Sequence, residues 1–258
     1  MEKIFVFIIG SVIGSFLNVC IYRIPKGKSV VRPRSYCPNC GKALSWYDNI
    51  PILSYLVLKG RCRSCKSKIS FRYFIVELLT AGTILLLSTT FGLTAKFFAY
   101  SILSCGLIIA TFVDFEIQEI PDEVTLFGIA LGLGLALAFP SIFGEGMRLR
   151  GLFASFLGAL TGGLSIYLIG FFGELVFKKE AMGGGDVKLL AMIGAFLGWK
   201  LALLTFFIAP VFGSIVGLIL KVKYGRQTIP YGPYLSLGAL VSILWGERIM
   251  QLLFYGLY

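Results

Sequence analysis

Long apolar runs fill most of the chain, and short polar segments separate them. The runs cover residues 4–22, 73–92, 96–113, 124–140, 151–177, 187–199, 202–220 and 231–257. Most are about 17–25 residues long, which is enough for a helix to cross a hydrocarbon core of about 30 Å. The run at 187–199 is short for a full crossing and fits a tilted, re-entrant or cavity-lining helix. The pattern predicts an all-α, polytopic membrane helix bundle with about eight transmembrane spans.

The composition agrees with a membrane protein and removes several classes of enzyme. Hydrophobic residues make up 57% of the chain and charged residues only 14%, whereas a soluble domain carries about 25% charged residues. The chain contains no histidine. It therefore cannot build a Ser-His-Asp triad, a Cys-His dyad or an H-E-x-x-H zinc protease. Acid–base chemistry must come from carboxylates, lysines, tyrosines or cysteines.

The positive charge is concentrated in residues 23–72. That segment holds twelve Lys or Arg and one acid, Asp48, so it accounts for the whole net charge of +11. Nucleic-acid binding explains it less simply than the positive-inside rule, because apolar runs flank the segment. With this segment in the cytoplasm, eighteen cations lie inside, including Lys179 and Arg226, and six lie outside. Both termini are then predicted outside. The first run is a retained anchor, since most of its flanking cations follow it rather than precede it as in a signal peptide.

Four cysteines form two C-x-x-C pairs, Cys37–Cys40 and Cys62–Cys65, with 21 residues between the pairs. Two such pairs predict a zinc site with four thiolate ligands, at the edge of the usual spacing of about 15–20 residues. Four thiolates leave no open coordination position, so the metal would be structural. Disulfides or a redox-active pair are the alternatives, and a reducing cytoplasm disfavours stable disulfides.

Two aspartates stand at the ends of apolar runs, where ionisable residues are candidates for function. Asp114 ends the third run, and Asp186 opens the sixth after three glycines, Gly183, Gly184 and Gly185. A pair of carboxylates sharing a proton would supply the base and the acid for peptide hydrolysis. The glycines would allow an extended substrate to lie beside Asp186. Each aspartate has a simpler explanation, as a helix N-cap or a solvated helix end.

These motifs and several others resemble the type IV prepilin peptidase family, the bifunctional leader peptidases/N-methyltransferases of type IV pilus and type II secretion systems. The further motifs are GSFLNVCIYRIP at 14–25, DNIPILSY at 48–55, VELLTA at 76–81, IPD at 120–122 and IPYGPY at 229–234. Together they cover nearly the whole chain in family order. The family is similar in its catalytic logic to G-x-G-D intramembrane aspartyl proteases. The resemblance thus implies that Asp114 and Asp186 are the catalytic pair.

The resemblance also implies a substrate and a second activity. The enzyme would cut the basic leader from prepilins or pseudopilins after a glycine, at the cytoplasmic face of a bacterial inner membrane. It would then methylate the new N-terminus with S-adenosylmethionine. The sequence contains no Gly-rich Rossmann motif for that cofactor, so Glu77 and residues 48–55 are the candidates. We expect three regions: a first span at 1–22, a cytoplasmic zinc module at 23–72 and a membrane peptidase core at 73–258.

Two other functions fit parts of the sequence. A transporter or assembly component would use buried carboxylates to relay ions, but it would be expected to show internal repeats, and none is evident. A membrane thiol-redox protein would need reactive thiols in an oxidising compartment, whereas these cysteines are predicted to be cytoplasmic. The partners predicted for the chain are prepilin precursors and membrane lipid, without nucleic acid.

Overall fold

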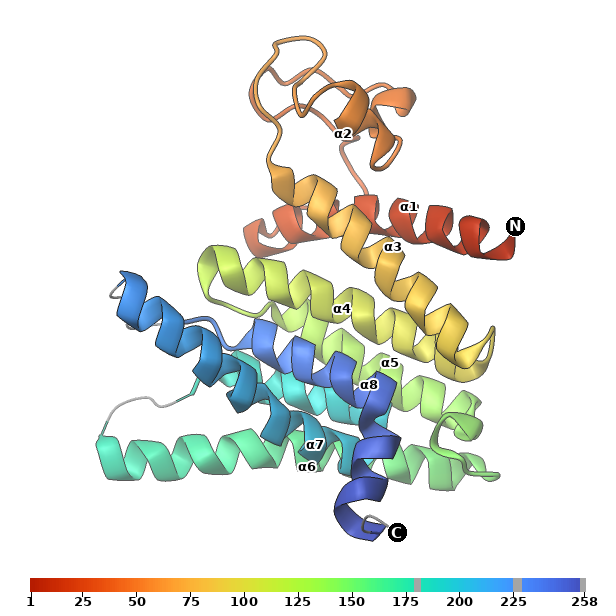
Figure 1. Ribbon diagram of the computed structural model, residues 1–258, viewed down its shortest axis with the longest axis vertical. Coiled ribbons are helices and arrows are strands. Elements are labelled where there is room, and N and C mark those ends of the chain that lie inside the picture. The colour runs from red at the N-terminus through yellow and green to blue at the C-terminus, as the bar shows by residue number, and fades with distance from the viewer. Residues whose placement is uncertain (179–181, 225–228, 256–258) are drawn as a thin grey trace. The chain divides into compact units, whose positions relative to one another are not determined.

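The computed structural model describes residues 1–178, 182–224 and 229–255, and the chain in it divides into two compact units, Met1–Gly92 and Leu93–Tyr258. The first unit contains α1 (Glu2–Arg23), η1 (Ile24–Lys26), η2 (Trp46–Asn49), α2 (Leu53–Val57) and α3 (Phe71–Phe91). The second contains α4 (Ala95–Ile117), α5 (Asp122–Ala138), η3 (Pro140–Phe143), α6 (Arg148–Phe177), α7 (Gly184–Tyr224) and α8 (Gly232–Tyr255). The described residues form helices and loops with two isolated β-bridges, so the predicted all-α class is confirmed (Figure 1).

In the first unit, α1 and α3 pack closely because glycines on α1 let the two backbones approach. A Cβ on Gly14 would lie 2.7 Å from the Cα of Glu77, and one on Gly10 would lie 2.8 Å from the Cα of Ala81. The buried Asn18 side chain adds a hydrogen bond of 3.0 Å to the carbonyl of Tyr73. These contacts fix the helix pair from which the 24–70 segment extends.

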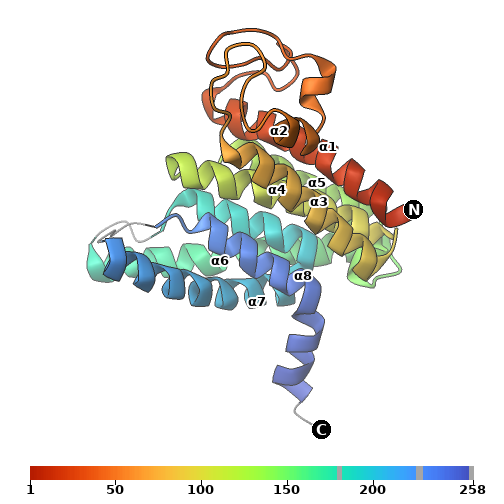
Figure 2. The same cartoon turned by 45° about the horizontal axis from the view of Figure 1, so that its top comes forward.

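In the second unit, α7 folds back on itself at Gly198. This residue has φ +78° and ψ 170°, a backbone conformation that suits glycine. Figures 1 and 2 show the two halves of α7 lying side by side. The second half runs antiparallel to α8, since Thr205 bonds to Ser242 while Gly213 meets Tyr234 near the start of α8. The predicted runs 187–199 and 202–220 correspond to these two halves.

Small residues also bring α6 against the first half of α7. A Cβ on either Gly158 or Gly194 would collide with the other's backbone carbonyl. Nearby, the Ser155 hydroxyl donates a hydrogen bond of 2.6 Å to the carbonyl of Ala195. Close backbone contact and hydrogen bonds between helices are what hold a bundle together in lipid, where burial of apolar surface contributes little.

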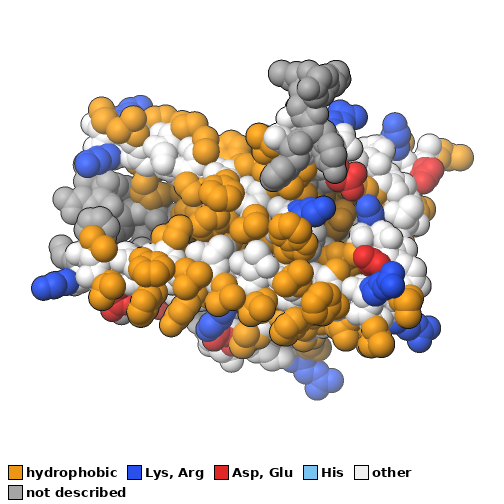
Figure 3. All heavy atoms as spheres, turned by 90° about the horizontal axis from the view of Figure 1, so that it is seen from below, with side chains coloured by type: hydrophobic (Ala, Val, Ile, Leu, Met, Phe, Trp, Pro, Cys, Tyr) orange, Lys and Arg blue, Asp and Glu red, His pale blue; other side chains and the backbone are white. Residues whose placement is uncertain are grey.

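The outer faces of the helices carry large apolar side chains. On α6 they recur at helical spacing, at Phe153, Phe156, Leu160, Leu164 and Tyr167. Figure 3 shows hydrophobic side chains over much of the face that it displays. Such an apolar exterior suits contact with lipid rather than water.

Within the described residues, five helices are long and apolar enough to cross a membrane. They are Glu2–Lys26, Phe71–Phe91, Ala95–Ile117, Arg148–Val176 and Gly184–Lys223, the last of which is folded at Gly198. The chain is therefore a multi-pass membrane protein by length and composition, and the count of eight spans stays a prediction. Of the cations counted for its orientation, Lys179 and Arg226 lie outside the described residues.

Candidate functional site

Asp114 lies in the last turn of α4 and is 5% exposed. Its Oδ2 accepts a hydrogen bond of 2.9 Å from the backbone N–H of Gly232, the first residue of α8. The start of a helix presents free N–H groups and a partial positive charge, both of which favour a carboxylate. A Cβ on Gly232 would stand 2.8 Å from the same oxygen. Glycine at 232 thus lets the helix start approach Asp114.

Asp186 lies in the first turn of α7, and its backbone N–H donates to the carbonyl of Gly183 at 3.1 Å. It is close enough to Asp114 for the charge of that residue to act on it. The fold therefore brings together, from α4 and α7, the two aspartates that the sequence singled out. Their catalytic role stays a prediction at this point.

The three glycines before Asp186 differ in their surroundings. A Cβ on Gly184 would meet nothing within 4 Å, and one on Gly183 would lie 3.4 Å from Asp186 Oδ2. Gly185 is the crowded one, because its Cβ would stand 3.0 Å from the Cβ of Ile120. Among the described residues, packing within the fold restricts a side chain at only one of these three glycines, Gly185.

Sequence reasoning assigned no role to Tyr231 and Gly232, which complete the surroundings of the aspartates. The Tyr231 hydroxyl is buried and has no hydrogen-bond partner among the described residues. It is close enough to Asp186 for that residue's charge to act on it. The IPYGPY motif at 229–234 was the available signal, but only the folded chain shows which residues it faces.

An ion pair joins the first turns of α5 and α7 beside this site. Lys188 Nζ lies 2.6 and 2.7 Å from the two carboxylate oxygens of Asp122, the first residue of α5. Both side chains are substantially exposed to solvent. The pair links the start of α5 to the start of α7 but contributes little to stability, as is usual for exposed pairs.

In the first unit, the four cysteine Sγ atoms lie within 4.8 Å of one another and could hold a metal ion. Each pair sits in its own turn, closed by a backbone hydrogen bond from Cys37 to Lys42 in one and from Cys62 to Ser67 in the other. The residue after each second cysteine is left-handed, Gly41 at φ +69° and Lys66 at φ +60°. The two halves of the site therefore repeat one turn geometry.

The thiols of this cluster are also polarised by neighbouring groups. A hydrogen bond from the Ser67 hydroxyl, with an Oγ to Sγ distance of 3.1 Å, lowers the pKa of Cys65 to about 6. The backbone N–H of Cys40 lowers the pKa of Cys37. These two effects favour the thiolate form, which is the form that ligates metals, whereas burial and the neighbouring Cys65 and Cys37 thiols raise the pKa of Cys40 to about 11.

Glu77, the candidate cofactor residue, is 8% exposed in α3. Its Oε2 accepts a hydrogen bond of 2.7 Å from the backbone N–H of Ile52, a residue held at φ +64°. At the other end of the same segment, Arg63 forms an ion pair of 2.7 Å with Asp48. Glu77 thus anchors the 48–52 segment to α3, which agrees with the sequence-based alternative that it is a polar packing residue.

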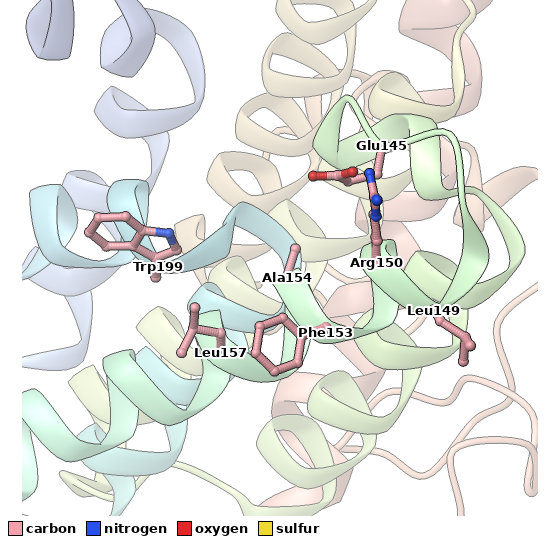
Figure 4. A pocket seen from close by; sticks show the side chains of 7 residues that line it. All are labelled: Glu145, Leu149, Arg150, Phe153, Ala154, Leu157 and Trp199. Atoms are coloured by element: carbon pink, nitrogen blue, oxygen red, sulfur yellow. The ribbon is translucent and has the colours of Figure 1, made fainter.

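The second unit also has an open pocket of about 480 Å³ that contains neither aspartate. It is lined by Glu145, Leu149, Arg150, Phe153, Ala154, Leu157 and Trp199 (Figure 4). Trp199 directly follows the turn of α7 at Gly198, so the pocket lies at the end of these helices opposite to Asp114 and Asp186. It is therefore separate from the aspartate site.

Comparison with known proteins divides the chain in nearly the same place as the fold. The model of the bacterial peptidase A24 N-terminal domain matches residues 8–91, and that of the type IV leader peptidase family matches residues 101–218. No solved structure matches the chain.

Curated proteins are similar over most of the chain. The prepilin leader peptidase/N-methyltransferase of Pseudomonas aeruginosa is 36% identical, covering 95% of this chain and 90% of the relative. The protein of the same name from Myxococcus xanthus is 40% identical over 86% of this chain, which spans 64% of that longer relative. An Escherichia coli type 4 prepilin-like proteins leader peptide-processing enzyme is 39% identical, covering 91% of this chain and 90% of the relative.

Proposed function

The chain belongs to the bacterial type IV leader peptidase family, and we propose that it removes the leader of type IV prepilins or pseudopilins and methylates the new N-terminus. The observation that carries the proposal is the meeting of Asp114 and Asp186 at one end of a membrane helix bundle, against the start of α8. The family match does not favour a transporter or a thiol-redox protein.

The proposed cleavage uses the two aspartates as an acid and a base. One carboxylate takes a proton from water, whose oxygen attacks the scissile carbonyl carbon, while the other gives its proton to the carbonyl oxygen. The C–N bond then breaks, and the leaving nitrogen takes up a proton. In the proposed mechanism the two carboxylates share one proton, because their like charges oppose double ionisation. The Gly232 N–H holds Asp114 in place during these steps.

The proposed substrate matches the position of the aspartates at the helix ends. A prepilin carries a basic leader followed by an apolar helix, so its cleavage site after glycine lies where the helix leaves the membrane. Asp114 closes one apolar helix and Asp186 opens another, which supports a position of both carboxylates at such a boundary. Under the positive-inside rule this boundary is the cytoplasmic face of the inner membrane.

We propose zinc as the metal of the four-cysteine site. In a tetrahedral site with Zn–S bonds of about 2.3 Å, sulfur atoms are about 3.8 Å apart, and Cys37 Sγ lies 3.8 Å from Cys65 Sγ. The remaining sulfur pairs, all within 4.8 Å, would need only small shifts to close on the ion. With four thiolates, zinc would stabilise the 37–65 region and take no direct part in chemistry.

We place methyl transfer in the Met1–Gly92 unit. S-adenosylmethionine, when bound, supplies a methyl group on a positively charged sulfur for transfer to the new amino terminus. The buried Glu77 carboxylate is the candidate for binding this cofactor, since one oxygen holds Ile52 and a carboxylate has further acceptor capacity. Binding of the cofactor measured by calorimetry should weaken in Glu77→Gln even where no methylation is assayed.

The deciding experiment is mass spectrometry of a prepilin incubated with the purified enzyme, with and without S-adenosylmethionine. Wild type should remove the leader and, with the cofactor, add about 14 Da for one methyl group. Asp114→Asn and Asp186→Asn should each lose cleavage. Asp122→Asn, the same change at an exposed aspartate, is the matched control and should keep it. Cleavage by both dyad variants would show that the aspartates are structural.

A further inference from the structure

Ile120 lies on the short loop between α4 and α5, directly beside the two aspartates. The loop begins with the left-handed Gln118, at φ +56°, whose N–H bonds to the carbonyl of Asp114 at 3.0 Å. Pro121 then precedes α5. The chain therefore turns sharply after the helix that carries Asp114, and Ile120 returns across the end of the bundle.

The side chain of Ile120 fills the space between the segments that carry the site. Its Cβ lies 3.0 Å from where a Cβ on Gly185 would stand, next to Asp186. Its Cδ1 lies 3.2 Å from where a Cβ on Gly232 would stand, and Asp114 Oδ2 lies 2.8 Å from that same point. The end of the isoleucine and the carboxylate of Asp114 therefore flank one position on the backbone. A branched apolar side chain thus forms one side of the space next to the two carboxylates.

The Ile120 side chain limits the size of the substrate side chain that can lie beside the aspartates. The scissile carbonyl carbon must come within about 3–3.5 Å of a water held by the carboxylates. The Cα before that carbon is bonded to it at a distance of only about 1.5 Å, so a side chain on this Cα enters the space beside the dyad. A glycine has no such side chain. Ile120 is flanked by two glycines of the enzyme where a Cβ would be crowded, with contacts of 3.0 Å at Gly185 and 2.8 Å at Gly232, and the same crowding applies to a substrate backbone that enters there.

We propose that Ile120 is the residue that restricts cleavage to substrates with glycine before the scissile bond. The inference rests on the proposed peptidase function and adds to it the residue that selects for glycine before the scissile bond. Ile120 sets specificity without chemistry of its own, because it offers no polar atom in its side chain. Shortening it should make room for a Cβ on the substrate and leave the carboxylates in place.

The test is competition between two prepilins that differ only before the scissile bond, one with glycine and one with alanine. For each enzyme the ratio of kcat/KM for glycine to that for alanine is measured. One methyl group in an apolar site changes such a ratio by about 10–200-fold. We expect Ile120→Ala to lower the ratio at least about tenfold, mainly by raising kcat/KM for alanine. Ile120→Val should lower it less. Ile117→Ala, an exposed isoleucine at the end of α4, is the matched control and should leave the ratio unchanged.

An Ile120→Ala enzyme that cleaves the glycine substrate with an unchanged ratio would overturn the proposal. If this variant cleaves neither substrate, Ile120→Val decides in its place, because losing one methyl group leaves most of the packing. A general loss of structure would lower both values of kcat/KM and not their ratio. Failure of the wild-type enzyme to cleave the glycine substrate would instead refute the peptidase function itself, so the two failures are distinguishable.

Discussion

The four-cysteine site and the aspartate site differ in how the chain assembles them. The cysteines lie within residues 37–65, and each pair is held by the hydrogen bonds of its own turn. The aspartate site draws on residues from 114 to 232, carried by α4, α7 and α8. The first needs two local turns and a metal, whereas the second exists only when the helices of the Leu93–Tyr258 unit are packed.

Because the two sites are assembled differently, we expect different changes to the chain to disrupt each of them. A change in helix packing should remove the aspartate site and spare the cysteine site, and loss of metal should do the reverse. The glycines of the second unit, at which a Cβ would collide with another helix, are therefore expected to matter as much as the aspartates themselves.

The largest effect is expected from Gly194→Leu. Its side chain would enter the backbone of Gly158, so α6 and α7 must separate. Such overpacking should cost about 3 kcal/mol or more of unfolding free energy and abolish cleavage, while the purified protein keeps its metal. Gly134→Leu is the control, since a Cβ there meets nothing within 4 Å. Thermal unfolding in detergent measures the loss of stability, metal analysis measures the bound metal, and a leader-cleavage assay measures the activity. Full activity in Gly194→Leu would show that this helix contact is dispensable.

Removing the metal should have the opposite effect, with loss of the cysteine site and retention of leader cleavage. Cys62→Ser takes away a buried ligand of the cysteine cluster. We expect zinc affinity to fall by more than the roughly 10–100-fold that loss of an outer-shell partner causes, because a direct ligand is removed. Methylation of an already cleaved pilin should be lost with it, while cleavage continues. Cys105→Ser, outside the cluster, is the control. Equal loss of both activities would contradict the separation of the two sites.

A smaller and more local effect is expected at the start of α8. In Gly232→Ala the new Cβ would stand 2.8 Å from Asp114 Oδ2 and displace the carboxylate. A shift of about 1 Å in a catalytic group can lower kcat about 100-fold. Gly184→Ala, in the glycine run itself, meets nothing within 4 Å of its new Cβ. It should therefore keep the folded structure, and any loss of activity there would be a loss of substrate binding, seen in KM.

The helices could be predicted from the sequence because each depends on a local apolar run. The predicted run at 96–113 falls within α4, and the run at 151–177 falls within α6. The fold-back at Gly198 separates the predicted runs 187–199 and 202–220, but a glycine between apolar runs does not reveal its φ of +78°. Helix pairing was also hidden, because the contact between Gly158 and Gly194 joins residues far apart in the chain.

The candidate sites divide in the same way. The cysteine cluster follows from spacing alone, and the structure confirms that the four sulfur atoms meet. Asp114 and Asp186 could be singled out by their positions at run ends, but their meeting depends on packing. Ile120 and Tyr231 carry no chemical signal of their own in the sequence. The hydrogen bond from Ile52 to Glu77 joins a loop to a helix 25 residues away, so the sequence named Glu77 and residues 48–55 as candidates without showing that they touch.

The smallest expected effect is that of Tyr231→Phe, which should increase stability and decrease kcat. The Tyr231 hydroxyl is buried without a partner among the described residues, beside Asp186. An unsatisfied buried hydroxyl costs about 1–3 kcal/mol, so Tyr231→Phe should raise the unfolding free energy by about 1 kcal/mol. If the hydroxyl donates to substrate or water at the dyad, kcat should fall about tenfold, as for loss of one hydrogen bond. Tyr167→Phe, on the exposed face of α6, should change neither quantity. A variant with a higher unfolding free energy and a lower kcat would show that the aspartate site keeps a polar group unpaired for catalysis. The four-cysteine site, whose role is structural, is not expected to contain such a group.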